Sequence, residues 1–138
     1  EENFRVFTLI SDGELGEGSN WEAILFAGHH KLGNLTAIVD YNKIQAMGDV
    51  KDILDLHPLD KKFASFGWHV EVVDGHNINE IHKALQDGEN IKDRPKVIIA
   101  NTTKGKGVSF MENQLLWHYR CPDPGELAEA KKELSKNV

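Results

Sequence analysis

The sequence predicts an α/β domain with a parallel sheet and helices on both of its faces. Three short apolar runs rich in β-branched residues, 5–10, 35–40 and 96–101, have the composition of strands that are buried on both sides. A weaker run of the same kind covers 68–74. Helix-like segments separate these runs, and such alternation is typical of right-handed crossovers between parallel strands. Ligands are then expected beyond the carboxyl ends of the strands.

The helix-like segments repeat apolar residues at the spacing of one helix face. In the first of them, Trp21 and Ile24 illustrate this spacing. Pro122 and Pro124 are expected to break the chain before the last segment, whose charge-rich composition suits an exposed helix. The four predicted helices cover 20–32, 58–66, 77–86 and 126–134.

The composition of the chain limits the classes of protein to which it can belong. A chain of 138 residues with 40 % apolar residues has material for one core, so we expect one domain over 1–138. The net charge of −6 argues against a nucleic-acid surface, because polyanion binding needs clustered Lys and Arg. No apolar run is long enough to span a bilayer, so a membrane partner is not expected either.

The single cysteine bears on the cellular compartment, and the first residue bears on whether sequence precedes this chain. Cys121 cannot form an internal disulfide, which fits a reducing compartment, and we expect a cytoplasmic protein. The chain opens at Glu1 without an initiator Met and enters a strand-like run almost at once. We therefore expect that preceding sequence was removed or is not included.

Acidic residues and glycines are combined directly after the first predicted strand, in the segment 11–18. Glycine lets backbone N–H groups approach phosphate oxygens, and the helix that follows begins with unpaired donors and a positive dipole end. This segment therefore predicts a site for a diphosphate. A carboxylate such as Asp12 would repel that group, unless it binds a divalent cation that the phosphates also bind. Asn42 follows the next strand and can supply a second, neutral oxygen at the same sheet edge.

The segment that joins these two residues resembles the transketolase family. An Asp-Gly at the end of a strand, followed by Asn thirty residues later, is similar to the thiamine-diphosphate motif, here from Asp12 to Asn42. Ser11 stands where the family usually has Gly, and Tyr41 where it often has Asp or Asn, but neither departure removes a metal ligand. The matching motifs cover nearly the whole chain and are Asp12 to Gly18, Trp21 to Ala23, Ala27 to Leu35, Asn42 to Gln45, Asp74 to Asn77 and Thr103 to Val108.

The resemblance implies a set of cofactor and metal contacts. Mg²⁺, for which Ca²⁺ or Mn²⁺ can substitute, would be held by Asp12, Asn42 and the backbone carbonyl of Ile44. Gly13 and the backbone of Glu14 would meet the diphosphate of thiamine diphosphate. The resemblance therefore implies that this chain supplies both the protein ligands of the metal and the contacts to the diphosphate.

Two further residues take their roles from the resemblance. His118 matches a late histidine that approaches the cofactor diphosphate or the substrate, although Tyr119 follows it where the family usually has Gly. We expect His118 to bind the cofactor and to act in catalysis. Glu17 matches a glutamate at the subunit interface, within a carboxylate network between paired active sites. The alternative for Glu17 is that its charge only supports the start of a helix.

Residues 102–107 follow the last predicted strand and combine hydroxyls, lysines and glycines. They lack the order of a P-loop, so nucleotide hydrolysis is disfavoured and a mobile loop over the active site is expected. Lys104 or Lys106 would meet a substrate phosphate there, or the loop is simply a solvated basic segment. His76 follows the fourth predicted strand, and we assign it to the turn that begins the next helix.

The function implied by the resemblance is that of a thiamine-diphosphate- and Mg²⁺-dependent transferase, which moves a two-carbon ketol unit between sugar phosphates. The cofactor would bridge two domains, with the diphosphate on this chain and the aminopyrimidine on another domain that supplies the activating Glu. No second sheet fits within 1–138, so the pyrimidine-binding domain is expected to be absent from it. A C-terminal transketolase subunit or domain is the expected partner, in a dimer or a heterotetramer.

Two alternatives remain open at this point. Deoxyxylulose-phosphate synthase shares the metal motif and a similar Lys-Gly-Lys-Gly loop, although Glu17-Gly18 followed by Trp21 to Ala23 favours transketolase. A noncatalytic cofactor-binding subunit would also fit a chain that cannot complete the site alone. The intact Asp12 and Asn42 argue against that interpretation, because a purely structural role would not require metal ligands.

Overall fold

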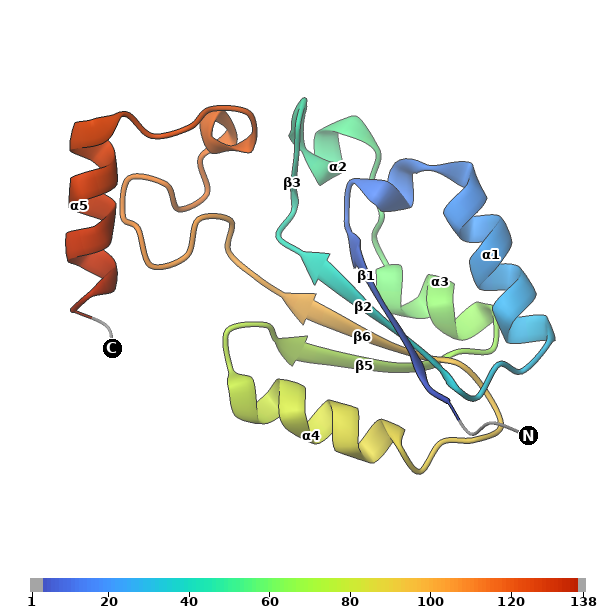
Figure 1. The fold of residues 1–138 in the computed structure, drawn as a ribbon. Coiled ribbons are helices and arrows are strands. Elements are labelled where there is room, and N and C mark those ends of the chain that lie inside the picture. The colour runs from blue at the N-terminus through green and yellow to red at the C-terminus, as the bar shows by residue number, and fades with distance from the viewer. Residues whose placement is uncertain (1–3, 137–138) are drawn as a thin grey trace.

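A computed structural model describes residues 4–136 and contains the predicted parallel sheet (Figure 1). Its four strands lie in the order β1-β2-β6-β5, and every neighbouring pair is parallel. The α/β fold class is therefore confirmed, and the four predicted strands are found within one or two residues of their expected bounds. These strands are β1 (Val6–Ser11), β2 (Leu35–Tyr41), β5 (His69–Asp74) and β6 (Lys96–Asn101).

The pairing register places the carboxyl ends of the four strands at the same level of the sheet. Ser11 pairs with Asp40, while Asn101 pairs with Tyr41 on one side and with Asp74 on the other. Residues that directly follow different strands are therefore neighbours at one edge of the sheet. The arrowheads in Figure 1 point to that edge.

The four predicted helices are also present, with bounds shifted by up to three residues. Several short elements were not predicted, because a single turn or a two-residue strand leaves no periodicity to detect. Within residues 4–136, no helix has both the length and the apolar character needed to cross a membrane. The helices are α1 (Gly18–His29), α3 (Leu59–Ser65), α4 (Ile78–Gly88) and α5 (Pro124–Leu134), and the short elements are η1 (Glu14–Gly16), β3 (Ile44–Gln45), β4 (Gly48–Asp49), α2 (Val50–Ile53) and η2 (Leu115–His118).

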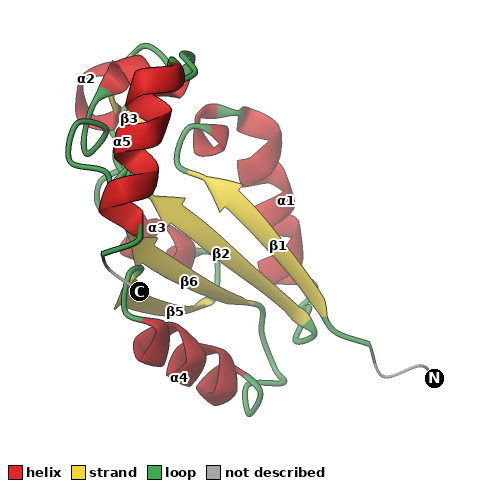
Figure 2. Cartoon of the chain, turned by 60° about the vertical axis from the view of Figure 1, so that its left-hand side comes forward, coloured by secondary structure: helices red, strands yellow, loops and turns green. Residues whose placement is uncertain are grey.

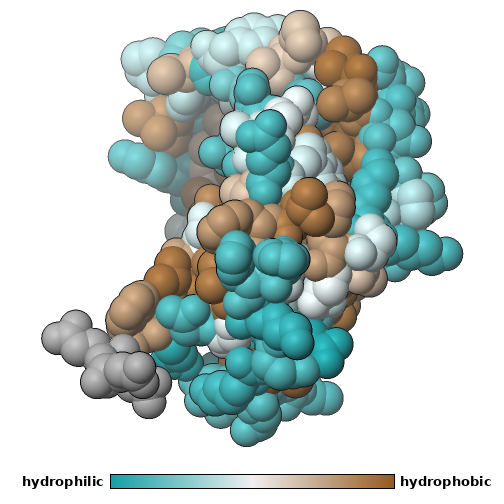
Figure 3. Space-filling view, turned by 90° about the vertical axis from the view of Figure 1, so that its right-hand side faces the viewer, coloured by the Kyte–Doolittle hydropathy of each residue, from teal (hydrophilic) through white to brown (hydrophobic). Residues whose placement is uncertain are grey.

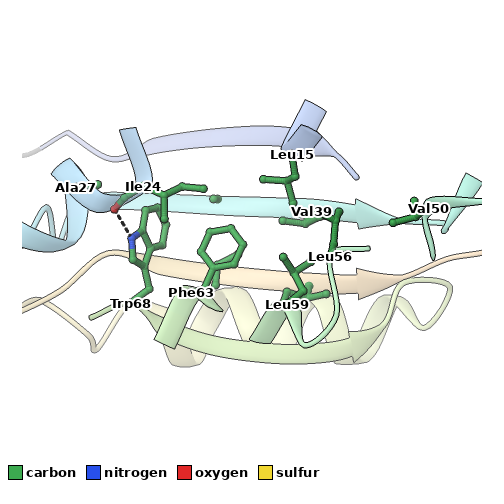
Figure 4. Close-up of a cluster of buried hydrophobic side chains, with 12 residues drawn as sticks. Leu15, Ile24, Ala27, Val39, Val50, Leu56, Leu59, Phe63 and Trp68 are labelled. Atoms are coloured by element: carbon green, nitrogen blue, oxygen red, sulfur yellow. Dashed lines mark hydrogen bonds between the residues drawn. The ribbon is translucent and has the colours of Figure 1, made fainter. Parts of the chain in front are cut away.

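The larger part of the core lies between the sheet and the helices α1 and α3 (Figure 4). Phe63 of α3 is fully buried there, with its ring 5.5 Å from the ring of Trp68. The indole N–H of Trp68 donates to the carbonyl of Ile24 at 2.8 Å. This bond connects α1 to the residue directly before β5. On the opposite face a smaller cluster, which includes Ala84 of α4 and Ile98 of β6, covers the other side of the sheet.

The expectation that the first strand is buried on both faces is wrong for β1. Phe7 is 51 % exposed and Leu9 is 71 % exposed. The reason is that α4 packs on β5 and β6 and leaves this side of β1 uncovered (Figure 2). Figure 3, which faces the α1 and β1 side of the molecule, shows hydrophobic patches among the hydrophilic surface.

The expectation that Pro124 stands outside the last helix is also wrong. Pro124 is the first residue of α5, a position where proline is tolerated because its missing N–H would have no helical partner. Asp123 caps the helix, since its side chain accepts the N–H of Glu126 while the Glu126 carboxylate accepts the N–H of Asp123. The proline thus begins the helix instead of delaying it.

Close packing between the end of α1 and the residue after α3 predicts a sharp effect at Gly28. A Cβ added there would lie 1.9 Å from the carbonyl oxygen of Phe66, a backbone atom that cannot rotate away. We expect Gly28→Ala to lower the free energy of unfolding by about 1–3 kcal/mol, as overpacking does. Gly18→Ala is the control, because a Cβ there meets nothing within 4 Å. Equal urea midpoints for the two variants would contradict this account of the α1–α3 contact.

Candidate functional site

A cavity of about 340 Å³ opens at the carboxyl edge of β1 and β2. It brings together the residues that the resemblance assigned to the metal, the cofactor and the interface, although they come from three separate segments of the chain, 11–17, 42–47 and 118. Lys104 and Lys106 do not line it. The lining residues are Ser11, Asp12, Gly13, Glu14, Glu17, Asn42, Ile44, Gln45, Ala46, Met47 and His118.

Asp12 is the most deeply buried of these residues, with only 1 % of its surface exposed. Its N–H donates to the carbonyl of Asp40 at 3.2 Å, which continues the pairing of β1 with β2 by one residue. The N–H of Lys43 donates to Oδ2 of Asp12 at 2.5 Å. Lys43 adopts a left-handed backbone conformation with φ of 70°, and this turn aims its N–H at the carboxylate.

Burial raises the pKa of Asp12 above its ordinary value, and the nearby charge of Asp40 raises it further. The backbone N–H groups of Lys43 and Gly13, with a smaller effect from His118, oppose this shift. No ion pair between Asp12 and a Lys or Arg side chain occurs within residues 4–136. A cation bound beside a buried carboxylate of this kind would stabilise its ionised form, because a nearby opposite charge favours that form.

Asn42 and Ile44 add neutral oxygens beside this carboxylate. Oδ1 of Asn42 accepts the N–H of Ile44 at 3.1 Å, and an amide oxygen has a second lone pair for another contact. In the described part of the chain, no three His, Cys, Asp or Glu side chains converge as a metal cluster. The donors on offer are one carboxylate and neutral oxygens, which suits Mg²⁺ bound jointly with phosphates and does not suit a closed protein cage.

The turn between β1 and α1 is held by Ser11 and Glu14. Oε2 of Glu14 accepts both the backbone N–H and the hydroxyl of Ser11, at 2.8 and 2.9 Å, and these bonds lower the pKa of Glu14. The N–H of Glu14 in turn donates to the hydroxyl of Ser11 at 3.2 Å. Ser-x-x-Glu is the reciprocal pattern of a capping box, so the sequence contained this signal and it was missed. Ser11, a departure from the family pattern, therefore fixes the shape of the turn.

Gly13 lies in the open centre of that turn. A Cβ added to it would come no closer than 3.7 Å to Cγ of Gln45, an ordinary contact distance. Its backbone has a right-handed helical conformation, which any residue adopts. Neither packing nor backbone geometry within the chain requires glycine here, so the missing side chain leaves space in the cavity itself.

Gln45 is a cavity residue to which the sequence assigned no role. Its Nε2 is buried and has no hydrogen-bond partner within residues 4–136. Buried donors are nearly always paired, and a phosphate group in the cavity would offer acceptors to the side-chain amide. No spacing pattern in the sequence distinguishes this glutamine from a surface residue.

His118 reaches the cavity from a distant part of the chain, at the end of η2. The neighbouring Trp117 anchors this turn, because its indole N–H donates to the carbonyl of Phe110 at 3.0 Å and its ring lies 5.5 Å from that of Phe110. The guanidinium of Arg120 covers the Trp117 ring at 4.6 Å. The structure therefore places His118 in the cavity that also contains Asp12, although Tyr119 replaces the usual Gly.

Glu17 stands at the rim of the cavity, in the N-cap position of α1. Its side chain is exposed and makes no capping hydrogen bond. Its position at a helix N-terminus is consistent with the dipole role, while its exposure leaves the carboxylate accessible to another chain.

A second cavity of about 670 Å³ adjoins the first and shares Asn42 and Ile44 with it. Thr102 and Thr103, which follow β6, form part of its wall. Cationic and acidic side chains are mixed along the remainder of this wall, so it has no single charge. The other lining residues are Tyr41, Lys43, Asp49, Val50, Lys51, Asp55, His57 and Asn113.

A parallel sheet with an acidic, glycine-containing cavity at the ends of two neighbouring strands defines an α/β ligand-binding domain. The family model for "Transketolase, thiamine diphosphate binding domain" matches residues 2–137. The chain belongs to this family, and the resemblance seen in its motifs is thereby confirmed.

Related proteins agree with this assignment. An apulose-4-phosphate transketolase subunit of Actinobacillus succinogenes is 46 % identical over 130 residues, which cover 94 % of this chain and 47 % of that protein. A 6-deoxy-6-sulfo-D-fructose transketolase subunit of Clostridium is 46 % identical over 113 residues, covering 82 % of this chain and 41 % of that protein. The chain thus spans less than half the length of these relatives.

Solved structures match the fold in the same way. The crystal structure of transketolase from Campylobacter jejuni superposes with a TM-score of 0.88 at 32 % identity. The match covers 96 % of this chain and 21 % of that one. The fold of this chain therefore recurs within a longer transketolase chain.

The open space at Gly13 predicts that a substitution there affects ligand binding without affecting the stability of the fold. We expect Gly13→Ala to keep the free energy of unfolding within about 1 kcal/mol of the wild type, since a Cβ meets only ordinary contacts. The same methyl group should weaken binding of Mg²⁺ with thiamine diphosphate at least tenfold by calorimetry. Gly16→Ala is the control, because Gly16 lies in the same turn but does not line the cavity. Wild-type affinity in the Gly13 variant would show that the cofactor does not occupy this space.

Proposed function

We propose that this chain is the diphosphate-binding part of a thiamine-diphosphate- and Mg²⁺-dependent transketolase-type enzyme. The enzyme would transfer a two-carbon ketol unit between sugar phosphates. The observation that carries the proposal is the single cavity that unites Asp12, Asn42 and Ile44 with the open turn at Gly13. The names of the related transketolase subunits support the reaction type.

In this proposal the metal ion is held by Oδ2 or Oδ1 of Asp12, Oδ1 of Asn42 and the carbonyl oxygen of Ile44. The buried carboxylate of Asp12, with its raised pKa and no cationic side chain bonded to it within residues 4–136, supports this set. Phosphate oxygens would complete the coordination, as Mg²⁺ prefers. Ca²⁺ or Mn²⁺ would occupy the same oxygens.

The diphosphate would lie along Gly13 and the backbone of Glu14, with His118, which lines the same cavity, as a further donor. When bound, thiamine diphosphate supplies the nucleophilic carbon that accepts the ketol unit, and the protein supplies orientation. His118 would then meet either the cofactor or the sugar phosphate during catalysis. Its location in the cavity, beside Asp12, supports that role.

The proposed enzyme needs a partner, because residues 4–136 contain one sheet of the required kind and the cofactor's aminopyrimidine needs its own pocket. That partner would be a C-terminal transketolase subunit or domain, assembled as a dimer or a heterotetramer. Two of the relatives are themselves named as subunits, which supports a divided enzyme. A cytoplasmic location completes the proposal and fits the exposed, unpaired Cys121.

Glu17 is proposed as an interface residue in this assembly. Its exposed carboxylate at the cavity rim supports contact with a second chain, and its lack of a capping bond argues against a purely local role. A network of carboxylates would share protons across such an interface, because closely placed carboxylates cannot all ionise cheaply. Unchanged sedimentation and cofactor binding of Glu17→Ala in the assembled enzyme would leave only the helix-dipole role.

The metal assignment predicts the effect of Asp12→Ala. We expect this variant to fold but to lose Mg²⁺-dependent binding of thiamine diphosphate, because the one carboxylate of the donor set is removed. Calorimetric titration of the assembled complex measures the loss, and Asn42→Ala should weaken binding in the same direction. Asp93→Ala is the control, since Asp93 is exposed, pairs with Arg94 and does not line the cavity. If the Asp12 variant bound thiamine diphosphate with wild-type affinity, Asp12 would not be a metal ligand.

The division between two polypeptides or domains predicts that the isolated chain has no ketol-transfer activity. Activity should appear only when a pyrimidine-binding transketolase subunit is mixed with it, because the cofactor then contacts both halves of its site. The assay follows transfer from a ketose phosphate donor to an aldose phosphate acceptor, with and without the partner. Substantial turnover by the purified chain alone would contradict the proposed division of labour.

A further inference from the structure

The turn between β5 and α4 contacts the loop after β6 through a side chain. The N–H of Thr103 donates to Nε2 of His76 at 2.7 Å, across 27 positions of sequence. The N–H of His76 donates separately to the carboxylate of Asp74 at 2.9 Å, which shapes the turn through the backbone alone. The ring contact is therefore an addition to the turn, and any residue could make the backbone contact.

The two loops approach so closely that little else can lie between them. A Cβ added at Gly75 would come within 2.4 Å of Cγ2 of Thr102, and the N–H of Gly75 donates to the carbonyl of Asn101 at 2.8 Å. The hydroxyl of Thr102 also donates to the carboxylate of Asp40. The base of the loop is thus held by β2 on one side and by the β5–α4 turn on the other.

The remainder of the loop is folded on itself by Glu112. Its carboxylate accepts the N–H of Gly107 at 3.0 Å and lies 3.5 Å from the ammonium of Lys106. The bond from Gly107 is the main cause of the lowered pKa of Glu112, with a smaller effect from the ammonium of Lys106. The loop therefore has a defined shape, and His76 is the side chain that connects this shape to the turn after β5.

The contact also defines the state of the imidazole. An Nε2 that accepts a hydrogen bond carries no proton, so the ring is neutral and its hydrogen is on Nδ1. A leucine at this position would fill similar space without an acceptor and would leave the Thr103 N–H unpaired. A glutamine has an oxygen at a comparable distance along its side chain and can accept the same N–H.

We propose that His76 is a positioning residue for the ligand site, acting through Thr103. Thr103 and Thr102 form part of the wall of the 670 Å³ cavity, which shares Asn42 and Ile44 with the proposed metal and diphosphate site. By holding Thr103, His76 sets the place of this wall relative to those two ligands. The inference rests on the proposed function, because it assigns the positioned loop to the binding of a phosphate-bearing ligand.

The contact itself is tested by amide hydrogen exchange, followed by NMR on the full 138-residue chain. We expect His76→Leu to accelerate exchange at Thr103 by about tenfold, because the amide loses its acceptor. His76→Gln should restore most of the protection. His82→Leu is the matched control, since His82 is an exposed histidine on α4 and does not belong to either loop. Unchanged exchange at Thr103 in the His76→Leu variant, with the fold intact, would overturn the proposal.

The positioning role is tested with Mg²⁺ and inorganic diphosphate as the probe. We expect His76→Leu to weaken binding about threefold to tenfold, the range that one hydrogen bond contributes, and His76→Gln to bind nearly as the wild type does. Faster exchange at Thr103 with unchanged diphosphate affinity would overturn the positioning role and leave a structural contact.

The same two measurements separate this inference from the function on which it rests. If the wild-type chain, assembled with its pyrimidine-binding partner, fails to bind Mg²⁺ with either inorganic diphosphate or thiamine diphosphate, the proposed function and the positioning role both fall. If the wild type binds both and only the His76 variants show no difference, the proposed function stands and the inference about His76 is wrong.

Discussion

The buried carboxylate of Asp12 sets the constraint on which the rest of the site depends. A charge that is only 1 % exposed must be met by donors or by a cation, because removing it from water is costly. Lys43 provides one such donor, because its left-handed backbone conformation directs its N–H to the carboxylate. That turn also brings Asn42 and Ile44 to the same place. One electrostatic requirement thus accounts for the backbone conformation of Lys43 and is met beside the donor oxygens of Asn42 and Ile44.

The sheet supplies the frame in which this requirement is satisfied. Because all four strands are parallel and end level, the residues after β1, β2, β5 and β6 meet at one edge. Polar groups there form hydrogen bonds across strands: the backbone N–H of Lys43 donates to Asp12, the hydroxyl of Thr102 donates to Asp40, and the backbone N–H of Thr103 donates to His76. The apolar core lies below this layer and is closed by α1, α3 and α4. Site geometry and core stability are therefore carried by different residues, so variants at the site need not unfold the chain.

Glycines in this protein serve two separate physical purposes. At Gly28 and Gly75 another part of the chain approaches so closely that a Cβ would collide with it, and the packing of the fold needs the empty position. At Gly13 the surroundings would accept a Cβ, and the empty position faces the cavity instead. Glycine is therefore required by packing at two of these motif positions and leaves space in the cavity at the third. Only the atoms around each position distinguish them.

The sequence by itself determined the strand and helix order, because apolar periodicity and turn residues are local properties. It also predicted that Asp12 and Asn42 would lie at one edge of the sheet if their strands were parallel neighbours, and the structure shows that pairing. Only the tertiary structure decided which side of β1 stays uncovered, how Trp117 brings His118 to Asp12, and which group the His76 ring meets. These depend on contacts between segments far apart in the chain, and the distance in sequence between two side chains carries no information about how their elements pack.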